Sequence, residues 1–220
     1  MQKSVIIVAG GSGKRMGSEI PKQFLLLKSK PILMYTVERF YSYDTTIEII
    51  LVLPKEQISV WQQLCVEYKF SIQHQIAEGG TERFYSVKNG LEKLQHNGIV
   101  AIHDGVRPFA SVDTIDRCFI KAKEAGAAIP VMPVVESLRK LKGENSYAVN
   151  RSEFVSVQTP QCFNIDLLKK AYEQNFSSEF TDDASVVEKA GVKVALVYGN
   201  VENIKITTPQ DLVLAEYLIH

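Results

Sequence analysis

Three cations and four glycines share one short segment near the amino terminus. Lys14, Arg15 and Lys22 supply the positive charge. The glycines that precede or separate these cations are Gly10, Gly11, Gly13 and Gly17. Glycine lets a ligand approach bare backbone N–H groups, and several N–H groups together with cations favour phosphate oxygens. The segment therefore predicts a binding site for a polyphosphate.

Two common phosphate-binding motifs do not fit this spacing. A P-loop needs a glycine five residues before its Gly-Lys pair, but Val8 stands there, and Arg15 takes the place of the metal-binding Ser or Thr. A dinucleotide-binding fingerprint that starts at Gly11 would need Gly or Ala where the chain has Met16. The spacing therefore indicates another class of nucleotide site.

The segment resembles the signature of sugar nucleotidyltransferases, in which Arg-Met and Pro-Lys follow a glycine-rich turn. Over nearly its whole length, the chain is similar to the 2-C-methyl-D-erythritol 4-phosphate cytidylyltransferase family of the non-mevalonate isoprenoid pathway. Further blocks match that family in order, at residues 79–86, 103–108, 159–161, 181–185 and 203–207. Ribitol-5-phosphate cytidylyltransferase shares much of this pattern and is the alternative. A nucleotide-sugar glycosyltransferase is more remote, because the sequence has no Asp-x-Asp metal motif.

The resemblance implies that CMP is transferred from CTP to the methylerythritol phosphate and that pyrophosphate is released. Both reactants are anions, so catalysis calls for fixed cations, backbone N–H donors and a divalent metal. By resemblance the catalytic residues are Arg15, Lys22, Arg151 and Lys205, with Arg151 donated by a second subunit. His103 is expected to support the site rather than act as a base, since no side-chain nucleophile needs activation.

The same resemblance assigns the binding residues. CTP would contact Ala9, Gly10, Gly11, Gly13, Gly80, Arg83 and Ser86. The polyol phosphate acceptor would contact Asp104, Arg107, Ser137 and Thr181. Asp104 would either hold Mg²⁺, or another divalent cation, against the triphosphate or accept hydrogen bonds from the acceptor's hydroxyls. Glu202 stands where the family usually has Asp, which leaves a second metal ligand open.

Alternating strand and helix patterns must position these residues. Residues 5–9 are apolar without alternation, which predicts a strand buried on both faces of a parallel sheet. Further strands are expected at 48–53, 71–76, 99–103, 127–133 and 193–197, and helices at 31–40, 55–68, 83–95, 113–125, 166–175, 182–190 and from 209 onward. This order predicts one α/β domain over residues 1–220, a doubly wound, mainly parallel, Rossmann-like sheet with its ligand cleft at the carboxyl ends of the strands.

Residues 136–157 break the alternation. A polar turn at 142–145 lies between apolar positions, which predicts a β-hairpin arm. Exposed apolar hairpin faces seek partners, and the resemblance implies that this arm crosses a two-fold axis to build a homodimer. The alternative is a surface hairpin that folds on its own subunit.

Composition indicates which kinds of partner the protein binds and which cellular compartment it occupies. The chain has 25 basic and 25 acidic residues, so no global charge attracts nucleic acid or an anionic membrane. Its three cysteines, Cys65, Cys118 and Cys162, lack the spacing of a zinc site and fit a reducing compartment. Neither a signal peptide nor an apolar run of about 20 residues is apparent, so a cytoplasmic location without a membrane partner is expected.

Overall fold

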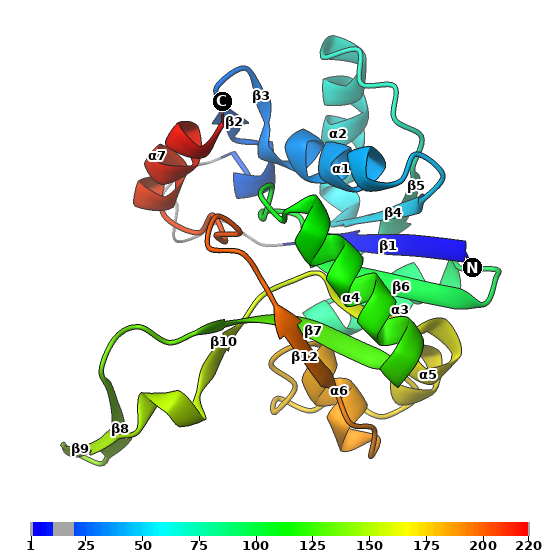
Figure 1. Cartoon of the computed structure of the whole chain (residues 1–220). Coiled ribbons are helices and arrows are strands. Elements are labelled where there is room, and N and C mark those ends of the chain that lie inside the picture. The colour runs from blue at the N-terminus through cyan, green and yellow to red at the C-terminus, as the bar shows by residue number, and fades with distance from the viewer. Residues whose placement is uncertain (1, 11–19, 220) are drawn as a thin grey trace.

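A central eight-stranded sheet organises the chain (Figure 1). The computed structural model describes residues 2–10 and 20–219. The strand order is β10-β7-β11-β6-β1-β4-β5, and β12 pairs with the other side of β7. β1, β4, β5 and β6 are parallel, whereas β11 runs antiparallel between β6 and β7. The bounds are β1 Gln2–Val8, β4 Glu48–Leu53, β5 Gln75–Glu78, β6 Gly98–Asp104, β7 Ala127–Pro133, β10 Val155–Val157, β11 Gln161–Asn164 and β12 Ala195–Tyr198.

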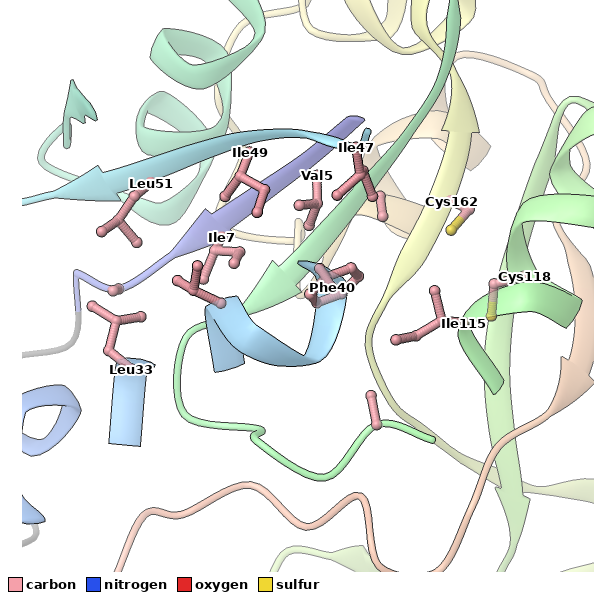
Figure 2. Close-up of a cluster of buried hydrophobic side chains, with 14 of the residues drawn as sticks. Val5, Ile7, Leu33, Phe40, Ile47, Ile49, Leu51, Ile115, Cys118 and Cys162 are labelled. Carbon is pink, nitrogen blue, oxygen red and sulfur yellow. The ribbon is translucent and has the colours of Figure 1, made fainter. Parts of the chain in front are cut away.

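Helices cover both faces of the sheet, as a doubly wound fold requires. One face carries α1 (Ile32–Tyr43), α2 (Lys55–Glu67) and α4 (Val112–Ala125), and the other carries α3 (Arg83–Glu92), α5 (Ile165–Ala171) and α6 (Asp183–Lys189). Side chains of β1 alternate between the two cores: Val5 and Ile7 join the first, which Figure 2 shows, and Ile6 joins the second. The predicted fold class is confirmed.

A third, smaller apolar cluster lies beside the edge where the parallel strands end. It joins β2 (Leu26–Leu27), the start of α1 and α7 (Pro209–Leu218) to the segment after β6, and β2 pairs with the short strand β3 (Lys30–Pro31). Thr208 caps α7 by accepting a hydrogen bond from the backbone N–H of Asp211, and Pro209 begins the helix, as its sequence predicts. This cluster anchors the chain on both sides of residue 205.

A β-hairpin extends away from the body of the sheet (Figure 1). It consists of β8 (Leu138–Lys142) and β9 (Asn145–Val149), and Gly143 takes a φ of 60° in the turn. A 3₁₀ helix, η3 (Arg151–Glu153), follows it. The last part of the predicted arm, β10, pairs instead with β7 of the main sheet. Its use in dimerisation stays a prediction.

Two other expectations about the sheet need correction. The pattern did not predict β11, because four residues after Pro160 are too short to show a periodicity. The strand expected at 71–76 instead runs from Gln75 to Glu78, where it pairs with residues 50–53 of β4, and the His74 ring just before it bonds to the Ile72 carbonyl and to Trp61. Among the helices of residues 2–10 and 20–219, none has the length and apolar character to cross a bilayer.

Candidate active site

Segments that follow three parallel strands line one cleft of about 220 Å³. Gly10 follows β1, Gly80 follows β5, and Asp104 ends β6. Lys22, at the start of the 3₁₀ helix η2 (Lys22–Phe24), and Lys205, in the segment before α7, line the same cleft. The predicted convergence of these residues at the carboxyl edge of the sheet is confirmed.

A second cleft of about 310 Å³ adjoins the first. Arg83, Asp104 and Lys205 line both clefts, whereas Arg107 and Thr181 line only the second. The arrangement offers adjacent places for two reactants, with one carboxylate and two cations at the boundary.

Asp104 carries negative charge at this boundary. Its Oδ2 lies 2.9 Å from Lys205 Nζ and 3.2 Å from Arg107 Nε, and its Oδ1 lies 3.9 Å from Arg83 Nε. Burial alone would raise the pKa of Asp104, but attraction to Arg83, Lys205 and Arg107 outweighs it and holds the pKa well below its usual range. Arg83 is also paired with Asp183, so Lys205 and Arg107 together exceed Asp104 by one positive charge, which favours phosphate.

The same charges bear on the metal role predicted for Asp104. A carboxylate that already faces three cations is a poor site for a fourth. Within the part of the chain that the structure describes, no group of three or more His, Cys, Asp or Glu residues could hold a metal ion. These surroundings favour the second predicted role, in which Asp104 accepts hydrogen bonds from substrate hydroxyls.

A chain of hydrogen bonds fixes the turn that carries Asp104 and Arg107. Thr159 Oγ1 accepts from the Asp104 backbone N–H at 3.1 Å, so its own proton is free to go to His103 Nδ1 at 3.0 Å. His103 Nε2 then donates to the Arg107 carbonyl at 3.0 Å. Burial lowers the pKa of His103 to about 4, so the ring stays neutral. His103 therefore supports the site, in line with the expectation that it is no base.

We expect the stability of the protein to fall between pH 6.5 and pH 4 because of His103. In this window the unfolded histidine takes up a proton and the folded one does not, so the free energy of unfolding decreases as the pH falls, by on the order of 3 kcal/mol. Urea unfolding at about pH 7 and about pH 4.5 measures this change. His103→Gln, which does not titrate, should show a smaller change, and equal changes in both proteins would contradict the assignment.

The segment that carries Lys205 is held by two hydrogen bonds to the turn after β6. Arg107 Nη1 donates to the Asn203 carbonyl at 2.8 Å, and the Ile206 N–H donates to the Val106 carbonyl at 3.0 Å. Asn203 itself is fully buried. Residues 203–207 form no strand, because these bonds tie them to the turn after β6 and not to a sheet edge. Lys205 is thereby fixed beside Asp104.

Arg83 is held by a buried carboxylate. Its Nη1 and Nη2 donate to the two oxygens of Asp183 at 2.8 and 2.7 Å, and the Tyr172 hydroxyl donates to the same carboxylate at 2.7 Å. The neighbouring Asp182 caps α6 by accepting from the Ser185 N–H. Arg83 lines both clefts, so the CTP contact stays a prediction. Its two terminal nitrogens are already paired with Asp183.

The turn after β5 needs glycine. A Cβ on Gly80 would lie only 2.3 Å from the Cβ of Tyr85. The Gly80 N–H donates to Ser86 Oγ at 3.1 Å, and this hydroxyl donates to the Glu82 carbonyl at 3.2 Å. The predicted cytosine-binding residues Gly80 and Ser86 thus form one hydrogen-bonded wall of the first cleft. Ala9, another predicted CTP contact, lines this cleft as well.

Other predicted residues lie elsewhere. Ser137 and Arg151 are exposed at the hairpin arm and line neither cleft of their own chain. Arg151 Nη1 donates to the Val135 carbonyl and lines a separate groove of about 530 Å³. This placement leaves room for the predicted role in another subunit. Gly11, Gly13 and Arg15 fall outside the described residues.

Several residues that line the clefts were not among the predicted contacts, including Gln23 and Thr159. Gln23 lines the first cleft and Thr159 the second. Thr159 stands inside the matching block at 159–161, and Gln23 directly follows the Pro-Lys of the signature, so the motifs lie at or beside both residues although no charge marked them out.

The two adjoining clefts lie at the carboxyl edge of a doubly wound sheet and carry excess positive charge. This arrangement suits a reaction between two phosphate-bearing molecules, which is the chemistry of a nucleotidyltransferase. The family model described as IspD, 2-C-methyl-D-erythritol 4-phosphate cytidylyltransferase, matches residues 4–220. The chain belongs to this family.

Relatives in this family are similar to the chain over its full length. The 2-C-methyl-D-erythritol 4-phosphate cytidylyltransferase of Bacteroides thetaiotaomicron is 56% identical over 219 residues, with 100% of each chain covered. The crystal structure of the Thermus thermophilus enzyme of that name has a TM-score of 0.80 at 35% identity and covers 99% of this chain and 98% of its own. The 4-diphosphocytidyl-2C-methyl-D-erythritolsynthase of Anaerococcus prevotii has a TM-score of 0.84 at 30% identity, with 100% and 99% covered.

Proposed function

We propose that the protein transfers CMP from CTP to 2-C-methyl-D-erythritol 4-phosphate, which gives 4-diphosphocytidyl-2-C-methyl-D-erythritol and pyrophosphate. The observation that carries this proposal is that Lys22 and Lys205 line the same cleft. The resemblance to the family implies that Lys22 stabilises the transition state and that Lys205 engages the acceptor phosphate. Membership of the family over residues 4–220 supports the same reaction.

The reaction joins two anions. A phosphate oxygen of the acceptor attacks the α-phosphorus of CTP, and the bond from that phosphorus to the bridging oxygen of the β-phosphate breaks. Pyrophosphate leaves with the electron pair of that bond. Negative charge grows on the α-phosphate and on the leaving group, so fixed cations lower the barrier most. We assign this role to Lys22 and, by family membership alone, to Arg15.

The two clefts divide the substrates between them. Cytosine would lie against Gly80 and Ser86, and the triphosphate would extend past Gly10 toward Lys22. The acceptor would occupy the second cleft, with its phosphate on the boundary cation Lys205. Its remaining contacts would be Asp104, Arg107 and Thr181, which line that cleft.

We propose that a divalent cation, such as Mg²⁺, accompanies CTP. Magnesium keeps several waters and is bound mostly through substrate phosphates with one or two carboxylates. Asp104 already faces three cations, so phosphate oxygens and water would supply most of the ligands. When bound, the ion would neutralise part of the triphosphate charge.

We also propose that the protein is a homodimer joined through the hairpin arm. Large apolar side chains on and beside the arm are exposed, including Leu141, Tyr147 and Phe154, and such clusters are typical of interfaces. The adjoining groove, which Arg151 lines, would take part of the partner. Arg151 would then reach the acceptor cleft of the other subunit, and Ser137 would contact the acceptor from the same arm.

Mixing two inactive variants should restore activity if Arg151 acts across the dimer. Each site would use Lys205 of one subunit and Arg151 of the other, so a dimer of one Arg151→Ala subunit and one Lys205→Ala subunit keeps one intact site and loses the other. If equal amounts of the two variants exchange subunits at random, half of the dimers are mixed, and turnover should recover to about one quarter of the wild-type value. Pyrophosphate release before and after mixing measures this. Recovery of no activity, with mixed dimers formed, would place Arg151 outside the partner's site.

The proposed reaction is tested by incubating the protein with CTP, Mg²⁺ and the acceptor and measuring pyrophosphate. Release that depends on 2-C-methyl-D-erythritol 4-phosphate supports the proposal. Ribitol 5-phosphate serves as the competing acceptor, and a preference for it would assign the alternative cytidylyltransferase. Folded, dimeric protein that releases no pyrophosphate with either acceptor would refute both.

We place the reaction in the cytoplasm. Cys65, Cys118 and Cys162 are all free thiols, two of them fully buried. Free thiols persist where the surroundings are reducing. This location matches a pathway that consumes CTP.

A further inference from the structure

We infer that Gln23 is a positioning residue, which holds Lys22 in the cleft by tying its segment to the end of β1. The inference rests on the proposed function, because it concerns how one proposed catalytic cation is kept in place. Gln23 directly follows Lys22 in η2, is fully buried and lines the same cleft.

One amide joins three elements around this cleft. Gln23 Nε2 donates to the Ala9 carbonyl at 2.7 Å and to Gln57 Oε1 at 2.5 Å. Ala9 directly follows β1, and its own N–H donates to the Val52 carbonyl of β4 at 2.9 Å. Gln57 lies on α2. The segment that carries Lys22 is therefore hydrogen-bonded to the end of β1, just before the glycine-rich segment of the sequence.

The orientation of this amide is fixed by its partners, and it leaves one amide atom unpaired. A carbonyl can only accept, so the amide nitrogen must face Ala9. Gln23 Oε1 is then buried and, among the described residues, has no hydrogen-bond partner. A buried acceptor without a partner costs stability. The amide nitrogen is nevertheless used twice, on Ala9 and on Gln57, so the side chain is placed to hold these two elements to the segment that carries Lys22.

A second contact holds η2 from its other end. The Phe24 ring stacks on Trp61 of α2, with ring centroids 6.2 Å apart, and the Leu25 N–H donates to the Lys22 carbonyl at 3.2 Å. A lysine side chain is long and flexible, so the position of its backbone limits what its ammonium can reach. Loss of the Gln23 tie would free the backbone of this segment from the end of β1, and misplacement of a reacting group by about 1 Å can cost about 100-fold in rate.

The test compares Gln23→Leu with a matched glutamine elsewhere. Gln23→Leu should lower kcat about tenfold or more, while the KM for CTP changes less than about threefold, because Lys22 acts in the transition state. The control is Gln174→Leu, since Gln174 Nε2 also donates to two carbonyls, those of Ala171 at 2.8 Å and Val186 at 3.0 Å, away from both clefts. The control should keep the wild-type kcat.

A double-mutant cycle separates positioning from general structure. If Gln23 acts through Lys22, adding Gln23→Leu to Lys22→Ala should lower kcat less than about threefold further. Trp61, the single tryptophan, is fully buried, and its fluorescence reports whether this region stays folded. If the leucine variant exposes Trp61, Gln23→Met replaces it in the same comparison.

Two results would overturn the inference. One is a Gln23 variant in which Trp61 stays buried and kcat keeps its wild-type value. The other is that the Gln23 substitution lowers kcat by the same factor in the wild-type protein and in Lys22→Ala. A wild-type protein without turnover would refute the proposed function and this inference together. An active wild type with an unaffected Gln23 variant would overturn the inference alone.

Discussion

Lys22→Ala should lower turnover by more than tenfold, which corresponds to at least about 1.4 kcal/mol of barrier, while CTP binding largely survives. Lys22 lines the nucleotide cleft, and its charge is proposed to act on the negative charge that grows in the transition state. Pyrophosphate release at saturating substrates measures turnover, and calorimetric titration with CTP measures binding.

Lys121→Ala is the control for this change. Lys121 lies on α4, its Nζ is 3.0 Å from Glu124 Oε2, and 44% of its side chain is exposed. Its removal should leave turnover unchanged, because it lines neither cleft. Full activity in Lys22→Ala would refute the role proposed for that lysine, and a loss of CTP affinity as large as the loss of turnover would make it a binding residue only.

Lys205→Met should lower kcat/KM for the acceptor on the order of 100-fold, or about 2.7 kcal/mol, while the KM for CTP changes little. Methionine keeps the apolar stem of the side chain and removes its charge. Lys205 Nζ lies 2.9 Å from Asp104 at the boundary of the two clefts, so its loss removes a cation from the proposed acceptor phosphate and from Asp104. Steady-state kinetics with each substrate varied in turn separates the two effects.

Lys205→Arg is the matched variant, because it keeps the charge with another geometry. It should lose less activity than Lys205→Met. Urea unfolding tests whether the methionine variant is simply unstable, since Asp104 keeps Arg83 and Arg107 as partners. An equal loss in the kinetic parameters of CTP and of the acceptor would contradict a role on the acceptor side.

Much of the fold could be predicted because its strands carry long apolar runs. Residues 48–53 and 127–133 were predicted with the bounds that β4 and β7 have. The antiparallel strand β11 was missed, because its four residues are fixed by pairing with β6 and β7 and not by a local pattern. A short strand of this kind depends on tertiary contacts.

The cationic residues of the site were predicted better than the polar residues that hold them. A lysine such as Lys205 in an apolar stretch is conspicuous, and it lies in the cleft as expected. Gln23, Thr159 and Asp183 carry no such signal, since their importance comes from partners far away in the sequence. Asp183 meets Arg83 across 100 residues, and Thr159 meets His103 across 56.

The central claim is that the nucleotide and the acceptor meet at Asp104 and Lys205. A crystal structure of the protein with CTP and 2-C-methyl-D-erythritol 4-phosphate tests it most directly. We predict cytosine against Gly80 and Ser86, with the acceptor phosphate, or the diphosphate of the product, in contact with the ammonium of Lys205. An acceptor phosphate bound outside the second cleft, with Lys205 untouched, would contradict the account.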